Sequence, residues 1–508
     1  MTRKEVLKTI AALCIFAVIF ALLTAVFKPK WNSYHSDQMQ TRLQGFYRQE
    51  KNSHNVIYLG SSFSYCGISP LKIWDEQKIT GYVFSGTGQK AWMSAYYLEE
   101  AFKYQTPEVV VYEAGAVLDE KESAEKNNRK SIDYMRWSPT KLKAILEICE
   151  NTGESKKEYL FPFLRYHSRW TDIGGEDANL KVDSSYFLMG TMSWCATRPV
   201  PAKKLAKYEQ WDAGAIEGSS LKVGPKSGNA VLKMKKMCEE KGSRFLLVRV
   251  PSMSWSLEEA AAVQSFADEN AIPYLDMNLY NDEIGIDWKK DTPDKGEHLN
   301  IFGCGKASGY LGQYLKDNYE FEERLSGENR KFWEESAKKR DSLENSYMLS
   351  QVNQCDEYMR LSDSEEFITM IVVPGTAKNR IPDEIKDTFE KRGLKLPEAD
   401  TVNEPYAALL DGTKTVFECF GGELSKEKSY IWDDTAFLLS SGDWTDAKQT
   451  KAFVDGREFE VDKEGINLVV YNKVLRQVVD VVNFDTAKEE IHAEHKNQPM
   501  IIDEDVLK

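Results

Sequence analysis

The 508-residue sequence lacks several features that would point to other classes of protein. It contains no tract of Lys and Arg, and its 66 basic and 80 acidic residues give a net charge of −14, so we expect no nucleic-acid partner. Its eight cysteines form no C-x-x-C pair and no Cys/His spacing of a zinc site, so we expect buried free thiols and no structural metal. It has no internal repeat at a fixed period, and nothing in it calls for a cofactor.

Only one stretch is long and apolar enough to cross a bilayer. The segment from Thr9 to Phe27 has no charged residue and has about the length of one membrane-spanning helix. Three basic residues precede it and two follow it, so positive charge favours a cytoplasmic N-terminus only weakly. The run is longer than a signal-peptide core and lacks a clean A-x-A cleavage site. We therefore expect an uncleaved anchor over residues 1–30, with a cleaved signal as the alternative, and residues 31–508 outside the cytoplasmic membrane.

Residues 52–320 alternate between apolar runs and helical patterns, after a polar stalk that we expect over residues 31–54. The order of strand, turn, helix and strand predicts an α/β domain with a parallel sheet, interrupted by a long helical insertion over residues 119–235. The strands are expected at residues 55–60, 81–85, 108–115, 243–251 and 273–278, and a closing helix at 305–316.

The C-terminal part has a different pattern. Residues 321–364 are rich in Glu, Lys, Arg and Asn and predict a solvated helical connector. Residues 365–490 contain many short apolar runs with turn residues between them and one helical segment. This pattern predicts a small β-rich domain of the α+β kind, followed by a charged tail.

Two segments of the α/β domain carry the residue types of nucleophilic catalysis. Gly60-Ser61-Ser62 follows the first expected strand, at the end where open parallel sheets bind ligands. The segment from Asp291 to Gly303 contains His298 a few residues after a carboxylate, an arrangement that can orient an imidazole for deprotonating a serine. Taken singly, the first is also explained by a helix N-cap and the second by a surface or buried structural histidine. Because a catalytic trio needs only spatial convergence, the two segments together favour an active site.

Gly60-Ser61-Ser62, Gly88-Gln89, and Asp294 with His298-Leu299-Asn300 together resemble the motif blocks of the SGNH/GDSL hydrolase superfamily. The resemblance extends to its membrane-anchored branch, which includes the D-alanyl-lipoteichoic-acid biosynthesis protein and the alginate acetylation proteins. It implies a three-layer fold around the parallel sheet. It also implies Ser62 as the nucleophile, His298 as the base and Asp294 as the acid.

The sequence departs from the family pattern in the blocks of the nucleophile and the acid. Ser61 stands where the family usually has an aspartate. One residue too many separates Asp294 from His298, which leaves Asp291 or Glu297 open as the acid.

The expected oxyanion hole also departs from the family. The resemblance implies an oxyanion glycine at Gly88, with Gly86 as the alternative. The family's asparagine after the third strand is absent from Glu113-Ala114-Gly115. Gln89 or backbone groups are therefore the expected donors.

A basic and aromatic cluster lies in the insertion. Arg165, His167, Arg169 and Trp170 fall within the six residues RYHSRW. We predict that this cluster binds an anionic or sugar acceptor, with a packed cap helix as the alternative.

The C-terminal domain carries a second resemblance. The segment Glu464 to Asn472 (EGINLVVYN), followed by Val479-Asp480 and Phe484-Asp485-Thr486, is similar to interleukin-like EMT inducer domains. Such domains also occur in the stem of a mammalian glycosyltransferase, where the fold binds carbohydrate. Residues 374–396 resemble another part of the same domain but in reversed order, which implies a permuted version. The resemblance implies carbohydrate binding, and a purely structural β-domain is the alternative.

These observations predict a serine acyltransferase or esterase, anchored by a single pass in the cell membrane with its catalytic domain outside. The resemblance implies a bacterial origin and a cell-envelope polysaccharide or teichoic-acid-like polymer as substrate. It also implies a membrane-bound O-acyltransferase as the partner that supplies the acyl group. The alternative is a catalytically inactive carbohydrate-binding or assembly protein of the envelope, because the altered blocks are compatible with lost chemistry.

Overall fold

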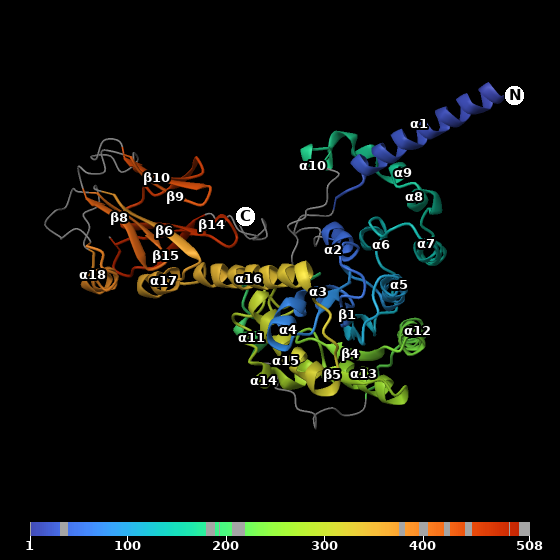
Figure 1. Ribbon diagram of the computed structural model, residues 1–508. Helices are drawn as coiled ribbons and strands as arrows, with labels where there is room; N and C mark the ends of the chain where they lie inside the picture. Colours follow the sequence, from blue (N-terminus) through green and yellow to red (C-terminus); the bar gives the residue numbers. More distant parts are fainter. Residues whose placement is uncertain are drawn as a thin grey trace. The chain divides into compact units, whose positions relative to one another are not determined.

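The computed structural model describes residues 2–30, 39–178, 188–192, 194–205, 219–374, 381–395, 405–420, 427–441, 450–486 and 488–496. The chain divides into two compact units, Met1–Ala337 and Lys338–Lys508. In Figure 1 the first unit runs from blue through green to yellow, and the second is coloured mostly orange and red. The first unit contains a parallel sheet, and the second contains antiparallel sheets.

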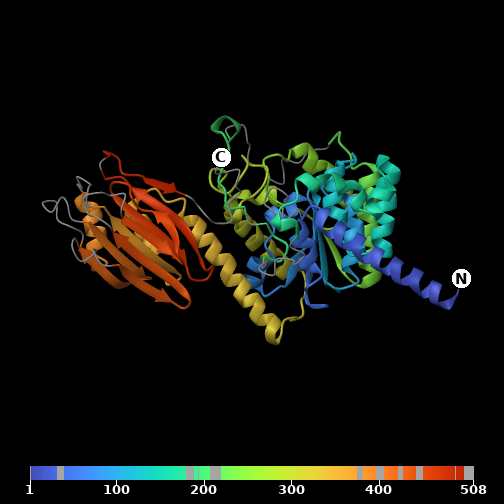
Figure 2. The ribbon, with the colours of Figure 1, turned by 90° about the horizontal axis from the view of Figure 1, so that it is seen from above.

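The N-terminal helix α1 (Arg3–Phe27) is apolar around its whole circumference, and none of its residues is buried. Thr2 and Glu5 form a capping box that starts it. Figures 1 and 2 both show its N-terminal part extending away from the rest of the unit. Among the described residues it is the one helix long and apolar enough to cross a membrane, a property that signal sequences share.

The first unit is built on a five-stranded sheet with the order β2-β1-β3-β4-β5, in which all four neighbouring strand pairs are parallel. The expected α/β architecture is therefore confirmed. This order places the topological switch point between β1 and β3, where doubly wound sheets bind ligands. The strands are β1 (Val56–Leu59), β2 (Gly81–Val83), β3 (Val109–Glu113), β4 (Arg244–Arg249) and β5 (Tyr274–Asp276).

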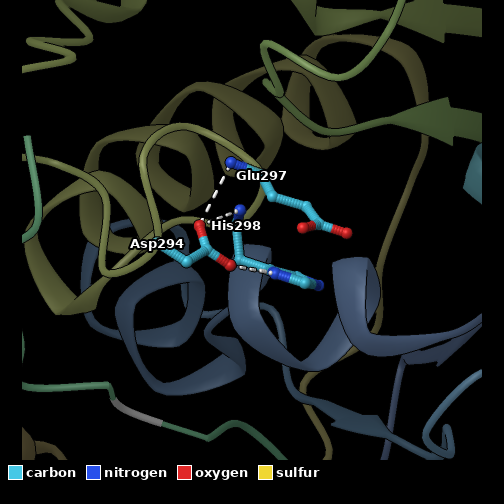
Figure 3. Close-up of side chains that lie close together, drawn as sticks. All are labelled: Asp294, Glu297 and His298. Carbon is cyan, nitrogen blue, oxygen red and sulfur yellow. Dashed lines mark hydrogen bonds and ion pairs between the residues drawn. The ribbon is translucent and has the colours of Figure 1, made fainter. Parts of the chain in front are cut away.

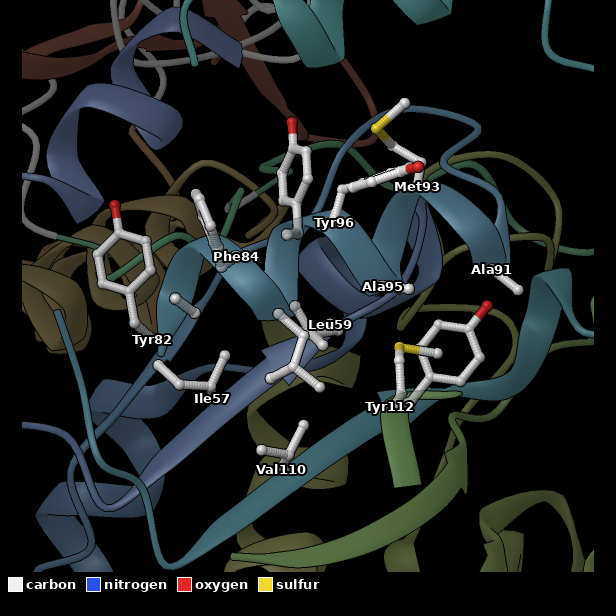
Figure 4. Packing of buried hydrophobic residues seen from close by; sticks show 14 of the residues in the cluster. Ile57, Leu59, Tyr82, Phe84, Ala91, Met93, Ala95, Tyr96, Val110 and Tyr112 are labelled. Atoms are coloured by element: carbon white, nitrogen blue, oxygen red, sulfur yellow. The ribbon is translucent and has the colours of Figure 1, made fainter. Parts of the chain in front are cut away.

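Helices cover both faces of this sheet, so the unit has three layers. Alternate residues of β1 enter different cores: Ile57 and Leu59 pack into one cluster, and Val56 and Tyr58 pack into another. Figure 4 shows the first cluster between the sheet and the helix that carries Ala91, Met93, Ala95 and Tyr96. The helices of the layers are α3 (Ser62–Gly67), α4 (Pro70–Gln77), α5 (Ala91–Ala101), α12 (Pro225–Lys241), α13 (Leu257–Glu269), α14 (Asn281–Ile284) and α15 (Ile301–Asn318), with the short 3-10 helices η2 (Ala114–Ala116) and η5 (Met277–Tyr280).

The segment between β3 and β4 is the expected helical insertion, except that its last helix, α12, belongs to the sheet-covering layer. Tyr134 and Tyr159, both in the insertion, are buried and join the core cluster of α5. The insertion helices are α6 (Glu125–Ile132), α7 (Pro139–Thr152), α8 (Lys156–Leu160), α9 (Phe163–Tyr166), η3 (His167–Thr171), α10 (Gly175–Ala178) and α11 (Ala202–Leu205).

The predicted start of the α/β domain at residue 52 is wrong, because α2 (Met39–Phe46) already belongs to its core. Phe46 stacks on Phe84 with ring centroids 4.1 Å apart. Arg42 is fully buried, donates to the carbonyl oxygen of Gly190 at 2.9 Å, and lies over the Tyr65 ring. These contacts stabilise the buried guanidinium of Arg42, and they explain how α2, which has a polar sequence, can lie in the core of the first unit.

The predicted solvated connector over residues 321–364 is also corrected. It forms α16 (Gly327–Leu349) and α17 (Cys355–Ser362), and the boundary between the two units falls within α16. Trp333, in the first unit, is fully buried and packs against Trp74 at 5.6 Å. Tyr347, in the second unit, is buried as well. Trp333, Ala337, Arg340, Leu343 and Tyr347 are buried and recur every three or four residues, so one face of α16 is internal.

The second unit is a β-rich domain, as expected. A six-stranded sheet with the order β15-β14-β13-β6-β7-β8 and a four-stranded sheet with the order β12-β11-β10-β9 share one apolar core. Both sheets are antiparallel. The elements are β6 (Phe367–Val373), α18 (Asp383–Glu390), β7 (Tyr406–Asp411), β8 (Lys414–Phe420), β9 (Lys428–Trp432), β10 (Thr435–Ser441), β11 (Thr450–Val454), β12 (Arg457–Glu460), β13 (Ile466–Asn472), β14 (Gln477–Phe484) and β15 (Ala493–Lys496).

Candidate active site

The candidate site lies at the carboxyl end of β1, beside the switch point of the sheet. Gly60 ends the strand with a φ of +140°, a conformation that favours glycine. A Cβ on Gly60 would lie 2.9 Å from the Cβ of Glu113, at the end of β3. The close approach of β1 and β3 therefore requires a glycine here, and the chain turns directly into α3, whose first residue is Ser62.

Ser62 and His298 meet in this turn, although 236 residues separate them. The Oγ of Ser62 lies 2.8 Å from Nε2 of His298. The other ring nitrogen, Nδ1, lies 2.6 Å from Oδ2 of Asp294. An ionised carboxylate only accepts hydrogen bonds, so Nδ1 carries the proton and Nε2 is free to accept the Ser62 hydroxyl proton.

The loop before α15 explains why Asp294 reaches His298 despite the extra residue. Lys295 and Gly296 both have positive φ, at 68° and 97°, so the chain makes a tight turn within the loop. Oδ1 of Asp294 accepts hydrogen bonds from the backbone N–H groups of Glu297 and His298, at 3.1 and 2.8 Å. Figure 3 shows these two bonds and the bond of Oδ2 to the imidazole. One carboxylate thus folds the loop and orients the ring.

The charge of Asp294 is stabilised in this position. Partial burial raises the pKa of its carboxyl, but the hydrogen bonds and the charge interaction with His298 outweigh that effect, so the pKa lies below its usual value. Asp294 therefore stays ionised at neutral pH, as the orienting role requires.

The two other carboxylates that the sequence left open do not contact His298 in this way. Oδ2 of Asp291 accepts from Nζ of Lys306 at 2.6 Å and from the backbone N–H of Asp287 at 2.7 Å. The Glu297 side chain is exposed. Its carboxylate oxygen, His298 and Asp294 offer ligand atoms within 4.8 Å of one another, the kind of group that can hold a cation. Asp294 and His298 already bond to each other there.

The predicted oxyanion segment lies against α3. The hydroxyl groups of Thr87 and Tyr65 are 3.4 Å apart, and Gly88 has a φ of +56°. A Cβ on Gly88 would lie 2.7 Å from Nδ2 of Asn127, an amide of α6 that the sequence did not single out. Asn127 thus closes one side of this turn.

Gln89 has a structural partner inside the fold. Its side chain is buried, and its amide nitrogen donates to Oγ of Ser94 at 2.9 Å. The side-chain amide therefore joins the turn to α5. Among the expected oxyanion donors, the backbone N–H of Ser62 stands at the first position of α3, where the helix itself supplies no acceptor.

Gly115, in the segment where the resemblance implied an asparagine, has no room for a side chain. A Cβ on Gly115 would lie 2.6 Å from Cδ2 of Phe63, so any side chain there would displace this ring. Phe63 stacks on His298 with centroids 4.9 Å apart. The space that an asparagine would need is occupied by the ring that packs on the imidazole.

The buried ion pair between Arg249 and Glu113 packs against the Phe63 ring. Nη1 of Arg249, at the end of β4, donates to Oε1 of Glu113, at the end of β3, at 2.7 Å, and both side chains are almost completely buried. The Arg249 guanidinium lies 4.1 Å from the centre of the Phe63 ring. Trp194 packs edge-on against His298 at 5.5 Å. Sequence reasoning missed these supporting residues, although an arginine in the apolar run of β4 was a usable signal.

The predicted acceptor patch RYHSRW is not a free basic surface. Arg165 is paired with Glu125 at 2.7 Å, and Arg169 contacts Asp177 at 3.2 Å and the carbonyl oxygen of Phe27 at 2.6 Å. Nδ1 of His167 bonds to the carbonyl oxygen of Leu164. The open pocket beside Arg165 is lined by Glu125, Glu154, Ser155, Glu158, Leu164, Arg165, His167 and Ser168. Its three carboxylates do not favour an anionic polymer, and sugar binding by this cluster stays a prediction.

No family profile and no curated protein matches the chain. The chain is similar to the crystal structure of a protein assigned as an acylhydrolase from Bacteroides fragilis, with 12% identity and a TM-score of 0.26 over 54% of this chain and 94% of the other. It is also similar to a GDSL-like lipase from Bacteroides thetaiotaomicron, with 10% identity and a TM-score of 0.27 over 55% and 98%. TM-scores this low do not establish a shared fold, so the interpretation depends on the geometry of the site itself.

Proposed function

We propose that the chain is a serine esterase or acyltransferase of the SGNH/GDSL type. The observation that carries the proposal is the continuous hydrogen-bond chain from Ser62 through His298 to Asp294, with distances of 2.8 and 2.6 Å. A serine, an imidazole of defined tautomer and an ionised carboxylate in this order are the machinery of acyl transfer through a covalent intermediate.

In the proposed reaction, Oγ of Ser62 attacks the carbonyl carbon of an ester and its proton passes to Nε2 of His298. The C–O bond to the leaving alcohol then breaks, and His298 returns the proton to that alcohol. In a second round, His298 deprotonates water or an acceptor hydroxyl, which attacks the carbonyl carbon of the acyl-serine. The bond between that carbon and Oγ of Ser62 then breaks, and His298 returns the proton to Oγ, which regenerates the free serine and releases the acid or the new ester. Asp294 holds the ring and stabilises the imidazolium in both rounds.

The negative charge on the carbonyl oxygen needs hydrogen-bond donors. We assign this role to the backbone N–H groups of Ser62 and Gly88. Each such donor contributes about 3 to 4 kcal/mol to the transition state in comparable sites. The supporting observations are the first helical position of Ser62 and the packing of the Gly88 turn against α3.

We further propose that the reaction takes place outside the cytoplasmic membrane, on acyl esters of a cell-envelope polysaccharide or teichoic-acid-like polymer. The apolar helix α1 supports an anchor, and the resemblance to the membrane-anchored branch supports the substrate class and a membrane-bound O-acyltransferase as partner. Carbohydrate binding by the second unit is part of the same proposal.

The esterase activity can be tested with the full-length chain in detergent and a 4-nitrophenyl acetate assay. Ser62→Ala is expected to lower kcat by roughly 10³-fold or more, because it removes the nucleophile. Ser64→Ala is the matched control, since its hydroxyl is buried in the same helix and has no hydrogen-bond partner among the described residues. Equal rates for the wild type and Ser62→Ala would refute the proposal.

A further inference from the structure

Large exposed apolar side chains outside α1 concentrate in one short part of the first unit. Ten such side chains occur among the described residues beyond α1, and six of them lie between residues 137 and 170. They are Trp137, Leu142, Leu146, Phe161, Leu164 and Trp170. Trp170 is 72% exposed, which is unusual for a tryptophan of a soluble domain. We call residues 137–170 the cap surface.

The cap surface is joined to the C-terminal end of α1. Phe163 of α9 packs edge-on against Phe27 at 5.2 Å and against Phe20 at 5.7 Å. Phe161 packs against Phe20 at 6.0 Å. Arg169 donates to the carbonyl oxygen of Phe27 at 2.6 Å, so polar contacts fix the same junction. Figure 1 shows α8 and α9 beside the end of α1.

Neighbouring contacts of the insertion fix the chain just after α1. Nζ of Lys28 donates to the carbonyl oxygen of Asp133 at 3.0 Å and lies over the ring of Tyr134. The hydroxyl group of Tyr134 donates to the carbonyl oxygen of Pro29 at 2.8 Å. The insertion therefore contacts both the last turns of α1 and the residues that directly follow it, and these contacts fix its position along the helix.

The rise per residue of an α-helix gives the depth in the bilayer of the side chains that contact α1. The uncharged stretch from Thr9 to Phe27 is about 28 Å long as a helix, close to the ~30 Å hydrocarbon core of a bilayer. If α1 spans that core, Phe27 lies at its edge and Phe20 lies about 10 Å deeper. A side chain that packs on Phe20 is then below the membrane surface. Phe161 and Phe163 both meet this condition.

The composition of the cap surface suits a lipid headgroup region. Residues 137–170 contain six basic and four acidic residues, and two of the basic ones, Arg165 and Arg169, are paired with Glu125 and Asp177 outside this range. Exposed Trp, Phe and Leu with interspersed Lys and Arg are typical of segments that lie in the membrane interface. The cluster RYHSRW, which does not suit an anionic polymer, belongs to this surface.

We propose that the cap surface lies in the outer interface of the phospholipid bilayer, continuous with α1. This interaction goes beyond the enzymatic proposal and rests only on the membrane anchoring proposed above. It would hold the insertion against the lipid at a defined depth, and the first unit would be oriented on the membrane by two elements instead of by a flexible stalk.

Fluorescence quenching in vesicles of phosphatidylcholine and phosphatidylglycerol tests this proposal on the full-length chain. An environment-sensitive dye is attached at Cys14, the exposed native thiol of α1, or at cysteines introduced as Leu164→Cys or Leu221→Cys in a Cys14→Ser background. Leu164 and Leu221 are 44% and 43% exposed and lie in the same unit, so they are a matched pair. Nitroxide-labelled lipids quench the dye from the membrane, and iodide quenches it from water.

We expect the labels at positions 14 and 164 to lose most of their emission to nitroxide lipids, and the label at 221 to lose it to iodide instead. Quenching at 14 but iodide access at 164 would overturn the cap-surface proposal and leave the anchor intact. Protection of 164 from both quenchers would mean that protein covers it, which also overturns the proposal. Iodide access at 14 would refute the anchoring on which it rests. Unchanged circular dichroism verifies the fold of each variant.

Discussion

At the scale of single residues, the proposed catalysis depends on the orientation of one imidazole, that of His298. Asp294 holds Nδ1 of His298 and the two backbone N–H groups of its own loop, while Phe63 packs on the face of the ring. Each of these contacts can be removed by a substitution that leaves the nucleophile in place.

Asp294→Asn is expected to lower kcat by roughly 10³- to 10⁴-fold, because an amide can donate to Nδ1 and so favours the wrong tautomer. Glu297→Gln removes the same charge three residues away, from an exposed side chain, and is expected to stay within about twofold of the wild type. The kcat of both variants on an aryl ester measures the difference. Similar losses in the two variants would show that Asp294 acts only through the general charge of the loop.

Gly115→Ala is expected to lower kcat, because the new Cβ would lie 2.6 Å from the Phe63 ring and push it away from His298. The overpacking is also expected to destabilise the first unit by about 1 to 3 kcal/mol. Gly174→Ala serves as the control, since nothing lies within 4 Å of its Cβ. Kinetics and urea denaturation of both variants check the prediction, and an unchanged kcat for Gly115→Ala would argue against the role of Phe63.

The sequence pointed to these residues to different degrees. Ser62 and His298 stood in recognisable blocks, because the nucleophile follows a strand and the histidine precedes a helix. Asp294 could not be separated from its neighbours by spacing, because the positive φ of Lys295 and Gly296 that absorbs the extra residue is a property of the folded loop. Phe63 and Arg249 acquire their roles only through packing between β1, β3 and β4.

At the scale of elements, strands were more predictable than helices. The parallel strands are buried on both faces and therefore read as apolar runs. The internal position of α2 and of α16 depends on side chains such as Arg42, whose charge suggests a surface although its guanidinium is fully paired inside. The sequence pattern around Arg42 does not reveal that its guanidinium contacts Gly190 and Tyr65, which lie far away in the chain.

One buried histidine, His54, and one partly buried histidine, His495, predict opposite pH responses for the two units. His54, before β1, is fully buried, and burial lowers its pKa to about 3. The unfolded chain binds a proton near the ordinary value of about 6.5. The first unit is therefore expected to lose stability as the pH falls below that value.

His495 of β15 behaves in the other sense. Its Nδ1 lies 2.7 Å from Asp480 and its Nε2 lies 2.9 Å from the carbonyl oxygen of Val352, so both nitrogens donate and the ring is protonated. Burial lowers its pKa, but the bonds to Asp480 and Val352 outweigh this and raise it above the ordinary value. The stabilisation is present below about pH 6.5 and is lost as the pH rises through the folded-state pKa.

Urea unfolding of each unit, followed by pulse proteolysis with peptide mapping at about pH 5.5 and about pH 8, measures these slopes. His54→Phe is expected to flatten the response of the first unit, and His495→Gln that of the second. Slopes of equal sign in both units, unchanged by the two substitutions, would contradict this assignment.

At the scale of the whole molecule, the chain combines an apolar helix, a three-layer α/β unit and a separate antiparallel β unit. The net charge of −14 gave no indication of the exposed apolar side chains beside α1, because a total charge does not report where apolar residues gather. The helical insertion was predictable as a segment. Its contacts with Phe20 and Phe27 were not, since they depend on where α1 ends relative to the fold.

The central claim is that Ser62 is an activated nucleophile. The most direct measurement is the site of covalent attachment of a fluorophosphonate probe on the full-length chain, located by peptide mass spectrometry. The account predicts one phosphonyl group on Ser62, little labelling after His298→Ala, and none on the corresponding peptide of Ser62→Ala. A wild-type protein that shows no more labelling than Ser62→Ala, or that carries the probe on another residue, would contradict it.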